Sequence, residues 1–169
     1  MTRLLAPDIF SRPLKVDRVP RGGSFEKISA DPGECRGLAA RLAVPAVHGL
    51  NAELRVSPWR GGGLKLEGAL RADLEQISVI SLEAFRQALE LPVLRYFLQR
   101  GATAQDDVDS DVIENGFVDL GEVVTETLAL ELPPYPRKPG EVFADPVGAP
   151  GEEAKPDSPF AVLNRHGRL

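Results

Sequence analysis

Residues 50–74 read LNAELRVSPWRGGGLKLEGALRADL, and apolar side chains alternate with polar ones on both sides of a glycine-rich turn. The apolar positions run from Leu50 to Val56 before the turn and from Leu64 to Leu74 after it. A period of two with one polar face is typical of a half-buried antiparallel hairpin. Charges of opposite sign on the polar face offer cross-strand pairs. The segment therefore predicts the central hairpin of a sheet.

The turn at residues 58–63 contains three consecutive glycines and the only tryptophan of the chain. A phosphate-binding P-loop would end in Gly-Lys-Ser/Thr and lead into a helix, whereas a strand pattern follows here. We therefore interpret the glycines as turn residues. Trp59 lies at the hairpin tip, where two roles are open: packing on the end of the core, which we favour, or stacking on a partner or a base.

Strands are also predicted outside this hairpin. Alternating patterns cover residues 9–17 and 25–30, and the Pro-Arg-Gly-Gly turn between them predicts a second antiparallel hairpin. Residues 76–98 are expected to continue the sheet, and a short strand is expected over 112–118. These segments together predict an antiparallel sheet built from hairpins.

Two helices are predicted from capping patterns. Asp31 and Glu34 are spaced as a capping box before an apolar stripe, and Asp119 and Glu122 repeat that spacing before a second stripe. A proline pair that begins at Pro133 ends the second helix, because proline cannot continue the hydrogen-bond ladder. We therefore expect an α+β fold in which both helices pack on one face of the sheet.

The composition of the chain divides it into two parts. Residues 1–134 are expected to form a single α+β domain, which includes an acidic loop at 101–111. Residues 135–169 are rich in Pro and Gly and lack periodicity, so we expect an irregular tail that ends in an apolar motif at 159–163.

The chain has 169 residues, of which 43% are hydrophobic, enough for one substantial core. No apolar run is long enough for a membrane span, and the first residues do not resemble a secretory signal. We therefore expect a soluble cytoplasmic protein without a membrane partner. Cys35 is the only cysteine, which rules out an internal disulfide and a cysteine zinc cluster. It lies on the apolar stripe of the first helix, so we interpret it as a core residue.

No set of residues indicates an active site or a metal centre. His48 and His166 are the only histidines, and no nucleophile–base–acid set accompanies them. The spacing of Asp107, Asp109 and Asp111 is not that of a calcium loop, because Gly is missing at the sixth position and Glu at the twelfth. The sequence therefore predicts no enzymatic activity, no cofactor and no metal ion.

Charge is distributed unevenly along the chain, whose formal net charge is −5. Residues 1–60 contain ten Lys and Arg against six Asp and Glu, whereas residues 101–136 contain nine acidic residues and no basic one. A local basic face can bind phosphates even in an acidic protein. Composition alone favours a plainer interpretation, a solvated surface with one acidic loop.

Five segments resemble the motifs of the YceD family, the bacterial and plastid large ribosomal RNA subunit accumulation proteins. The longest is DLGEVVTETLALELP at 119–133, and YPRKPG at 135–140 is similar to the form in alphaproteobacterial members. SPFAVL at 158–163 resembles the C-terminal motif. FSRPL at 10–14 and QISVISLEAF at 76–85 resemble the N-terminal strand and the central motif. The chain is identified as a family member, because the order and spacing of all five segments agree.

The central motif departs from the family at two positions. Many members have Cys where Ser78 stands, and some have a second Cys where Ser81 stands, which creates a Cys-x-x-Cys pair. Both positions are serine here. Metal binding or redox chemistry at this site is therefore not expected.

The resemblance implies a non-enzymatic role in ribosome biogenesis, in which the protein supports accumulation or processing of the 23S ribosomal RNA precursor and assembly of the large subunit. The implied partner is 23S rRNA or its precursor, and direct contact would use basic side chains, which neutralise phosphates. No RNP-type aromatic motif or KH-type loop is present, so sequence-specific base readout is not predicted. The candidate RNA-binding residues are Arg12, Lys15, Arg18, Arg21, Arg36, Arg41, Arg137 and Lys138.

The residues of the family motifs have structural interpretations, chiefly helix capping, close approach of backbones at glycine, and helix termination by proline. Direct RNA contact is the alternative for these residues. They are Asp119, Leu120, Gly121, Glu122, Pro133, Pro159 and Phe160.

A protein-binding adaptor is the alternative function. Its acidic segment would capture a basic ribosomal protein or an assembly factor, because acidic loops steer basic partners through long-range attraction. The candidate partner-binding residues are Asp106, Asp107, Asp109, Asp111 and Phe160.

Overall fold

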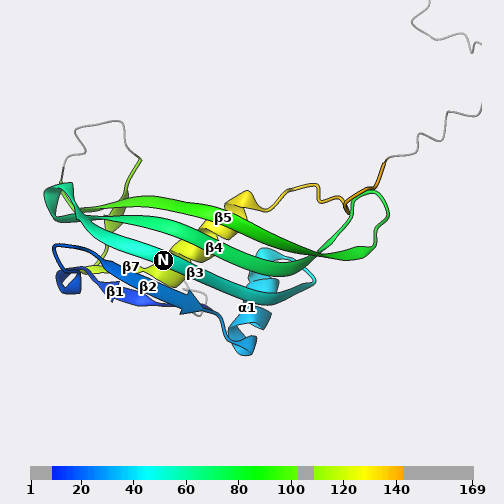
Figure 1. Ribbon diagram of the computed structural model, residues 1–169, viewed down its shortest axis with the longest axis horizontal. Helices are drawn as coiled ribbons and strands as arrows, with labels where there is room; N and C mark the ends of the chain where they lie inside the picture. The colour runs from blue at the N-terminus through cyan, green and yellow to red at the C-terminus, as the bar shows by residue number, and fades with distance from the viewer. Residues whose placement is uncertain (1–8, 103–108, 143–169) are drawn as a thin grey trace, which may run out of the picture.

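The computed structural model describes residues 9–102 and 109–142. Its main layer is a five-stranded sheet in the order β2-β3-β4-β5-β6, and a separate two-stranded sheet pairs β1 with β7 (Figure 1). Two α-helices accompany the sheets, so the predicted α+β class is confirmed. The elements are β1 (Pro13–Lys15), the 3₁₀ helix η1 (Val16–Arg18), β2 (Ser24–Ser29), α1 (Pro32–Leu42), β3 (Ala46–Trp59), the 3₁₀ helix η2 (Arg60–Gly62), β4 (Gly63–Ile77), β5 (Ala84–Gln99), β6 (Asp111–Ile113), β7 (Phe117–Asp119) and α2 (Leu120–Glu131).

β3 and β4 are the long central strands of the sheet, paired antiparallel from Ala46 opposite Glu75 to Trp59 opposite Gly63. η2 connects them, and Gly61 has a φ of +63° within it. Glycine adopts this left-handed conformation at no steric cost, which explains the glycine-rich turn. The apolar positions of the alternation all face the core, and they are Leu50, Ala52, Leu54, Val56, Leu64, Leu66, Leu70, Ala72 and Leu74.

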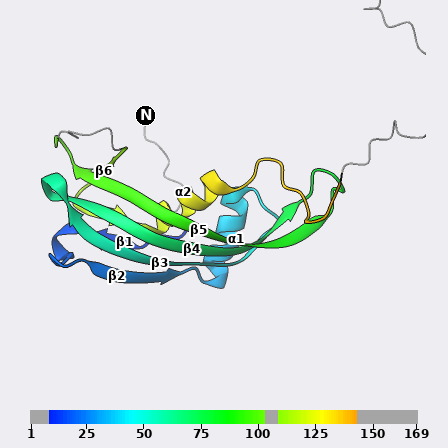
Figure 2. The same cartoon turned by 45° about the horizontal axis from the view of Figure 1, so that its top comes forward.

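β5 extends the sheet as the antiparallel neighbour of β4, from Leu64 opposite Phe97 to Ile77 opposite Ala84. The chain leaves the sheet between these two strands, at residues 78–83. β6 lies beyond β5 at the edge of the sheet and runs parallel to it for three residues (Figure 2). The sheet is therefore antiparallel except at this edge.

The expected hairpin between residues 9–17 and 25–30 is wrong. The first segment is extended only in β1, after which η1 turns the chain, and β1 pairs with β7 rather than with β2. β2 pairs instead with β3, from Ser24 opposite Val56 to Ser29 opposite Asn51.

Hydrogen bonds between the N-terminal segment and the start of α2 explain why β1 pairs with β7. The Asp119 carboxylate accepts a hydrogen bond of 2.8 Å from the Arg12 backbone N–H and another from the Ser11 hydroxyl. The Leu120 N–H donates to the Arg12 carbonyl at 3.0 Å. The last of these bonds satisfies the Leu120 N–H at the start of α2, and together the three bonds hold residues 11–12 beside that helix, away from β2.

The strand predicted over 112–118 is two short strands, β6 and β7, separated by a turn. Asn115 and Gly116 have φ values of +52° and +77°, which is the left-handed pair that a tight hairpin turn requires. The Asn-Gly dipeptide is a recognised signal for this turn, so the break was readable from the sequence.

Both helices begin where the capping patterns place them. In α1 the Asp31 side chain accepts from the Glu34 N–H, and the Glu34 side chain accepts from the Asp31 N–H, which confirms the first capping box. Asp119 caps α2 by accepting from the N–H groups of Gly121 and Glu122. The predicted second capping box does not form, because the Glu122 carboxylate pairs with Arg41 of α1 instead of the Asp119 N–H.

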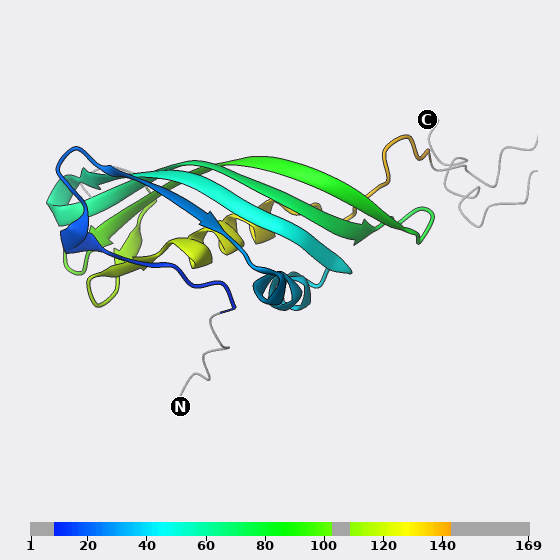
Figure 3. The ribbon, with the colours of Figure 1, turned by 60° about the horizontal axis from the view of Figure 1, so that its bottom comes forward.

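Figure 3 shows α1 and α2 on the same side of the five-stranded sheet. Their buried side chains, among them Leu38 of α1 and Val124 and Leu128 of α2, join the apolar face of the sheet in one core. Cys35 is buried in that core, as its place on the helix stripe predicts. In residues 9–102 and 109–142, no helix is both long enough and apolar enough to cross a membrane.

Candidate nucleic-acid interface

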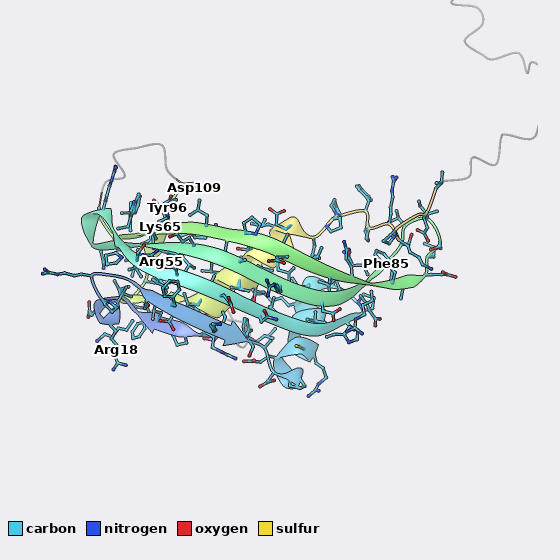
Figure 4. All side chains as sticks on the ribbon, in the orientation of Figure 1. Arg18, Arg55, Lys65, Phe85, Tyr96 and Asp109 are labelled. Atoms are coloured by element: carbon cyan, nitrogen blue, oxygen red, sulfur yellow. The ribbon has the colours of Figure 1, made fainter. Side chains whose placement is uncertain are left out.

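Three of the basic side chains proposed for RNA contact lie together. Lys15 ends β1, Arg18 ends η1, and Arg21 lies in the turn before β2; all three are exposed. Gly23 holds this turn against β3, since a Cβ on it would lie 2.7 Å from the Val56 carbonyl oxygen. The turn therefore lies toward the end of the molecule where η2 closes the central hairpin, and Figure 4 shows Arg18 at this end.

Arg55 of β3 adds a further cation at this end, which the sequence analysis did not include. Its side chain is exposed on the face of the sheet opposite the helices, and its guanidinium carbon lies 5.6 Å from the centre of the Phe25 ring. The alternation along β3 contained the signal, because Arg55 occupies a polar position between buried Leu54 and Val56. We call Lys15, Arg18, Arg21 and Arg55 the basic end.

Arg12 has a different environment from these four residues. Its guanidinium donates to both carboxylate oxygens of Glu34, at 2.7 and 2.9 Å, and to the carbonyls of Ser11 and Ser29. It also lies 4.7 Å from the centre of the Phe10 ring. The hydrogen bond from Arg12 holds the pKa of Glu34 below its ordinary value of 4.5. These contacts join the N-terminal segment to β2 and α1, which is a structural role.

The remaining basic candidates lie elsewhere on the molecule. Arg41 pairs with Glu122 and thereby links α1 to α2. Arg36 is exposed on α1. Arg137 and Lys138 follow α2, and the Lys138 ammonium lies 3.5 Å from the Glu83 carboxylate. The eight candidates therefore do not form one surface, and their role in RNA contact stays a prediction.

One of the acidic candidates, Asp111, lines a different surface. A groove of about 660 Å³ runs between β6, β7 and α2 and is lined by the carboxylates of Asp111, Glu114, Asp119, Glu122 and Glu126. Arg95 of β5 partly neutralises it, with nitrogens 3.7 Å from Asp111 and 3.0 Å from Glu126. Asp109 is exposed just before β6. Asp106 and Asp107 lie outside the described residues.

The motif residues at the start of α2 serve the fold. Asp119 caps the helix, Leu120 is buried, and Glu122 forms the pair with Arg41. Gly121 permits close approach as predicted, because a Cβ there would lie 2.1 Å from the Phe10 carbonyl oxygen. α2 ends at Glu131, just before Pro133. Pro159 and Phe160 lie outside the described residues.

The two serines of the central motif hold a carboxylate. The hydroxyls of Ser78 and Ser81 both donate to Glu141, one to each oxygen, and Ser81 does so at 2.5 Å. The Val79 N–H donates to the Pro136 carbonyl at 2.9 Å. The hydrogen bonds from Ser78 and then Ser81 hold the pKa of Glu141 below its ordinary value of 4.5. This contact fastens the segment after α2 to the turn between β4 and β5.

Comparisons with known proteins give one match. A family model described as "Large ribosomal RNA subunit accumulation protein YceD" matches residues 66–165, which is more than half of the chain. No curated protein matches the chain, and no solved structure matches it. The matched region begins within β4 and includes the turn at Ser78, β5 and all of α2.

Proposed function

The chain belongs to the YceD family of large ribosomal RNA subunit accumulation proteins, and from this we propose that it is a non-enzymatic, cytoplasmic ribosome biogenesis factor. In this proposal it supports accumulation or processing of the 23S rRNA precursor and assembly of the large subunit. The alphaproteobacterial type of the 135–140 segment remains a prediction.

The basic end is the single observation that carries a direct contact with RNA. Lys15, Arg18 and Arg21 lie at the end of β1, at the end of η1 and in the turn before β2, where long exposed side chains can follow an irregular phosphate backbone, and Arg55 extends the positive charge onto the sheet. Among these, the Lys15 ammonium has a carboxylate nearby, that of Asp17 at 3.8 Å and largely exposed. An exposed ion pair at this distance contributes little stability, so a phosphate can readily replace Asp17 as the partner of Lys15.

The state of the reactive side chains supports a binding role over a catalytic one. Burial raises the pKa of the Cys35 thiol, which disfavours the nucleophilic thiolate. His48 is hydrogen-bonded to Glu75 across the β3–β4 pair, and the Ser78 hydroxyl donates to Glu141. Each of these groups is engaged in a contact that stabilises the fold.

The test is crosslinking and sequencing of RNA bound to the tagged protein in growing cells. We expect precursor 23S segments to be enriched over mature rRNA. The triple variant Lys15→Gln, Arg18→Gln, Arg21→Gln should lose this enrichment and remain folded. A matched variant that removes the same charge elsewhere, Arg36→Gln, Arg137→Gln, Lys138→Gln, should keep it. Equal RNA yields from the two triple variants would refute contact through the basic end.

The acidic groove favours the adaptor as a second candidate function. Its carboxylates surround two exposed apolar side chains, Val112 and Phe117, and this combination suits a basic segment that also carries apolar residues. Crosslinking mass spectrometry should then join Glu114 to a basic large-subunit protein, and Glu114→Gln with Asp109→Asn should weaken that capture at low salt. Capture that is unchanged in the double variant would exclude the groove.

A further inference from the structure

The five-stranded sheet has one covered face and one open face. The helices cover the face that carries Leu54 of β3, Leu66 of β4 and Val93 of β5, all of which are buried. The intervening residues point to the other side, and Arg55 and Leu94 among them are exposed. We call that side the open face, and it lies toward the viewer in Figure 1.

Ion pairs occupy most of the open face. They join neighbouring strands at distances of 2.5 to 3.1 Å, so that the charges of each pair are locally balanced. Such a surface has no net attraction for an anion. The ion pairs are Lys27 with Glu53, Arg71 with Glu90, and Arg86 with Asp73, and His48 is hydrogen-bonded to Glu75 on the same face.

At the end of the open face nearest η2, three aromatic side chains make up part of the surface. Phe25 of β2 is 78% exposed although it is a large apolar side chain. Trp59, the last residue of β3, lies against Tyr96 of β5 with ring centroids 4.7 Å apart. Figure 4 shows Arg55 and Tyr96 at this same end of the sheet, with Lys65 between them.

The strand register places these side chains in adjacent rows. Phe25 lies opposite Arg55, and Lys65 of β4 lies opposite Tyr96. Strands are about 4.8 Å apart, so a row from β2 to β5 crosses about 14 Å. The Lys65 ammonium pairs with Glu67 at 2.5 Å, which leaves Arg55 as the net positive charge of the rows. We call Phe25, Arg55, Trp59 and Tyr96 the aromatic platform.

We propose that the aromatic platform binds an unpaired, single-stranded segment of RNA by stacking its bases on the rings. This inference rests on the proposed function, in which the partner is ribosomal RNA, and it adds the form of the RNA and the manner of binding. Arg55 can pair with a backbone phosphate, and the Phe25 side chain, which the guanidinium covers on one face, remains 78% exposed and can stack with a base on the other.

The chemistry of the platform favours a single strand over a duplex. Every base presents a π face, and aromatic side chains on a sheet can stack with bases only when those bases are unpaired. Duplex RNA hides these faces in its own stack and would contact only the cations. Stacking of this kind tolerates many sequences, which agrees with the lack of a sequence-reading motif.

Charge continuity also favours RNA over a protein partner. The basic end adjoins the platform, since Ser24 at the start of β2 lies opposite Val56 and only the turn that contains Arg21 separates β2 from η1. A strand of RNA stacked on Phe25 and Tyr96 can therefore continue onto Arg18 and Arg21. A phosphate backbone fits this sequence of rings followed by cations.

The test uses the fluorescence of Trp59, which is the only tryptophan and lies within the platform. The probes are oligouridylate of about 12 nucleotides, within the usual size range of a single-strand site, and an RNA duplex of equal length. Titration of the full chain with oligouridylate should quench Trp59 emission, because a base in stacking contact opens a non-radiative path for decay of the indole excited state. The duplex should bind more weakly and leave the emission unchanged.

Two variants and a control locate the contact. Phe25→Ala should weaken oligouridylate binding about tenfold, which is the loss of about one stacked base. Tyr96→Ala should have a similar effect, with circular dichroism to verify folding. Tyr135→Ala removes a ring that is 74% exposed in the segment after α2, and it should leave the affinity unchanged. Anisotropy of end-labelled RNA gives the affinities.

The outcomes separate this inference from the proposed function. Binding of oligouridylate without quenching, and with equal affinity for wild type and Phe25→Ala, would overturn the platform and leave contact through the basic end intact. Equal affinity for the duplex and the single strand would also overturn it. Binding of neither RNA would refute direct RNA contact and the platform together.

Discussion

Replacement of Arg12 by alanine tests whether this residue serves the fold or the RNA. The wild-type guanidinium makes a two-pronged pair with Glu34 and donates to two backbone carbonyls on different segments. Arg12→Ala removes all of these bonds and the contact with the Phe10 ring. Glu34 keeps one partner in the variant, since it still accepts from the Asp31 N–H at 2.8 Å.

The expected loss of stability is about 2–3 kcal/mol. Hydrogen bonds to charged groups contribute about 1.5–3 kcal/mol in proteins. The Arg12 side chain is 34% exposed and that of Glu34 is 19% exposed, so solvent screening holds the pair toward the lower part of that range. The carbonyl bonds to Ser11 and Ser29 and the Phe10 contact supply the remainder. In a chain of this size the loss corresponds to a fall in Tm of roughly 5–10 °C.

Thermal and urea unfolding followed by circular dichroism measure this effect. Combination with Glu34→Gln completes a double-mutant cycle, and the coupling free energy should be about 1–2 kcal/mol. Lys15→Ala is the control, because its side chain is exposed and its ammonium lies 3.8 Å from Asp17. The control should change the free energy of unfolding by less than about 0.5 kcal/mol.

Equal stabilities for Arg12→Ala and Lys15→Ala would refute the structural role of Arg12. In that case the guanidinium would be available to RNA, and Arg12 would again be a candidate for RNA contact. If the role is structural, folded Arg12→Ala protein should bind RNA as the wild type does.

Three further predictions follow from single contacts. Gly121→Ala should destabilise the protein by at least about 2 kcal/mol in thermal unfolding, because its Cβ would lie 2.1 Å from the Phe10 carbonyl oxygen; an unchanged Tm would contradict the close approach. Ser78→Ala should raise the pKa of Glu141 toward 4.5 in an NMR titration, and a fixed value would mean that the hydroxyl is not its partner. The lowered pKa of Glu34 stabilises the folded protein, and this stabilisation is complete above pH 4.5 and is lost as the pH falls through the folded-state pKa. Glu34→Gln should therefore flatten the acid limb of the stability curve, and parallel curves for wild type and variant would refute this.

The candidate site was only partly readable from the sequence. The sequence located basic residues near the N-terminus, and three of them, Lys15, Arg18 and Arg21, follow one another over β1, η1 and the turn before β2. It also grouped Arg12 with them, because distance along the chain does not reveal that Glu34 lies against that guanidinium. The aromatic platform was missed except for Trp59, because its members come from three strands and meet only through the strand register.

Local patterns in the sequence determined the α+β class, the central hairpin, both helix starts and the glycine-rich turn. Each of these depends on interactions between residues close in the chain: the two-residue period of a strand, a capping side chain three residues from its partner, or a glycine that adopts positive φ. The tertiary structure alone decided that β1 pairs with β7, that Glu122 binds Arg41 instead of its own helix start, and that Phe25 and Tyr96 share one face. Such pairings depend on which distant segments the burial of the core brings together, and no local period encodes that choice.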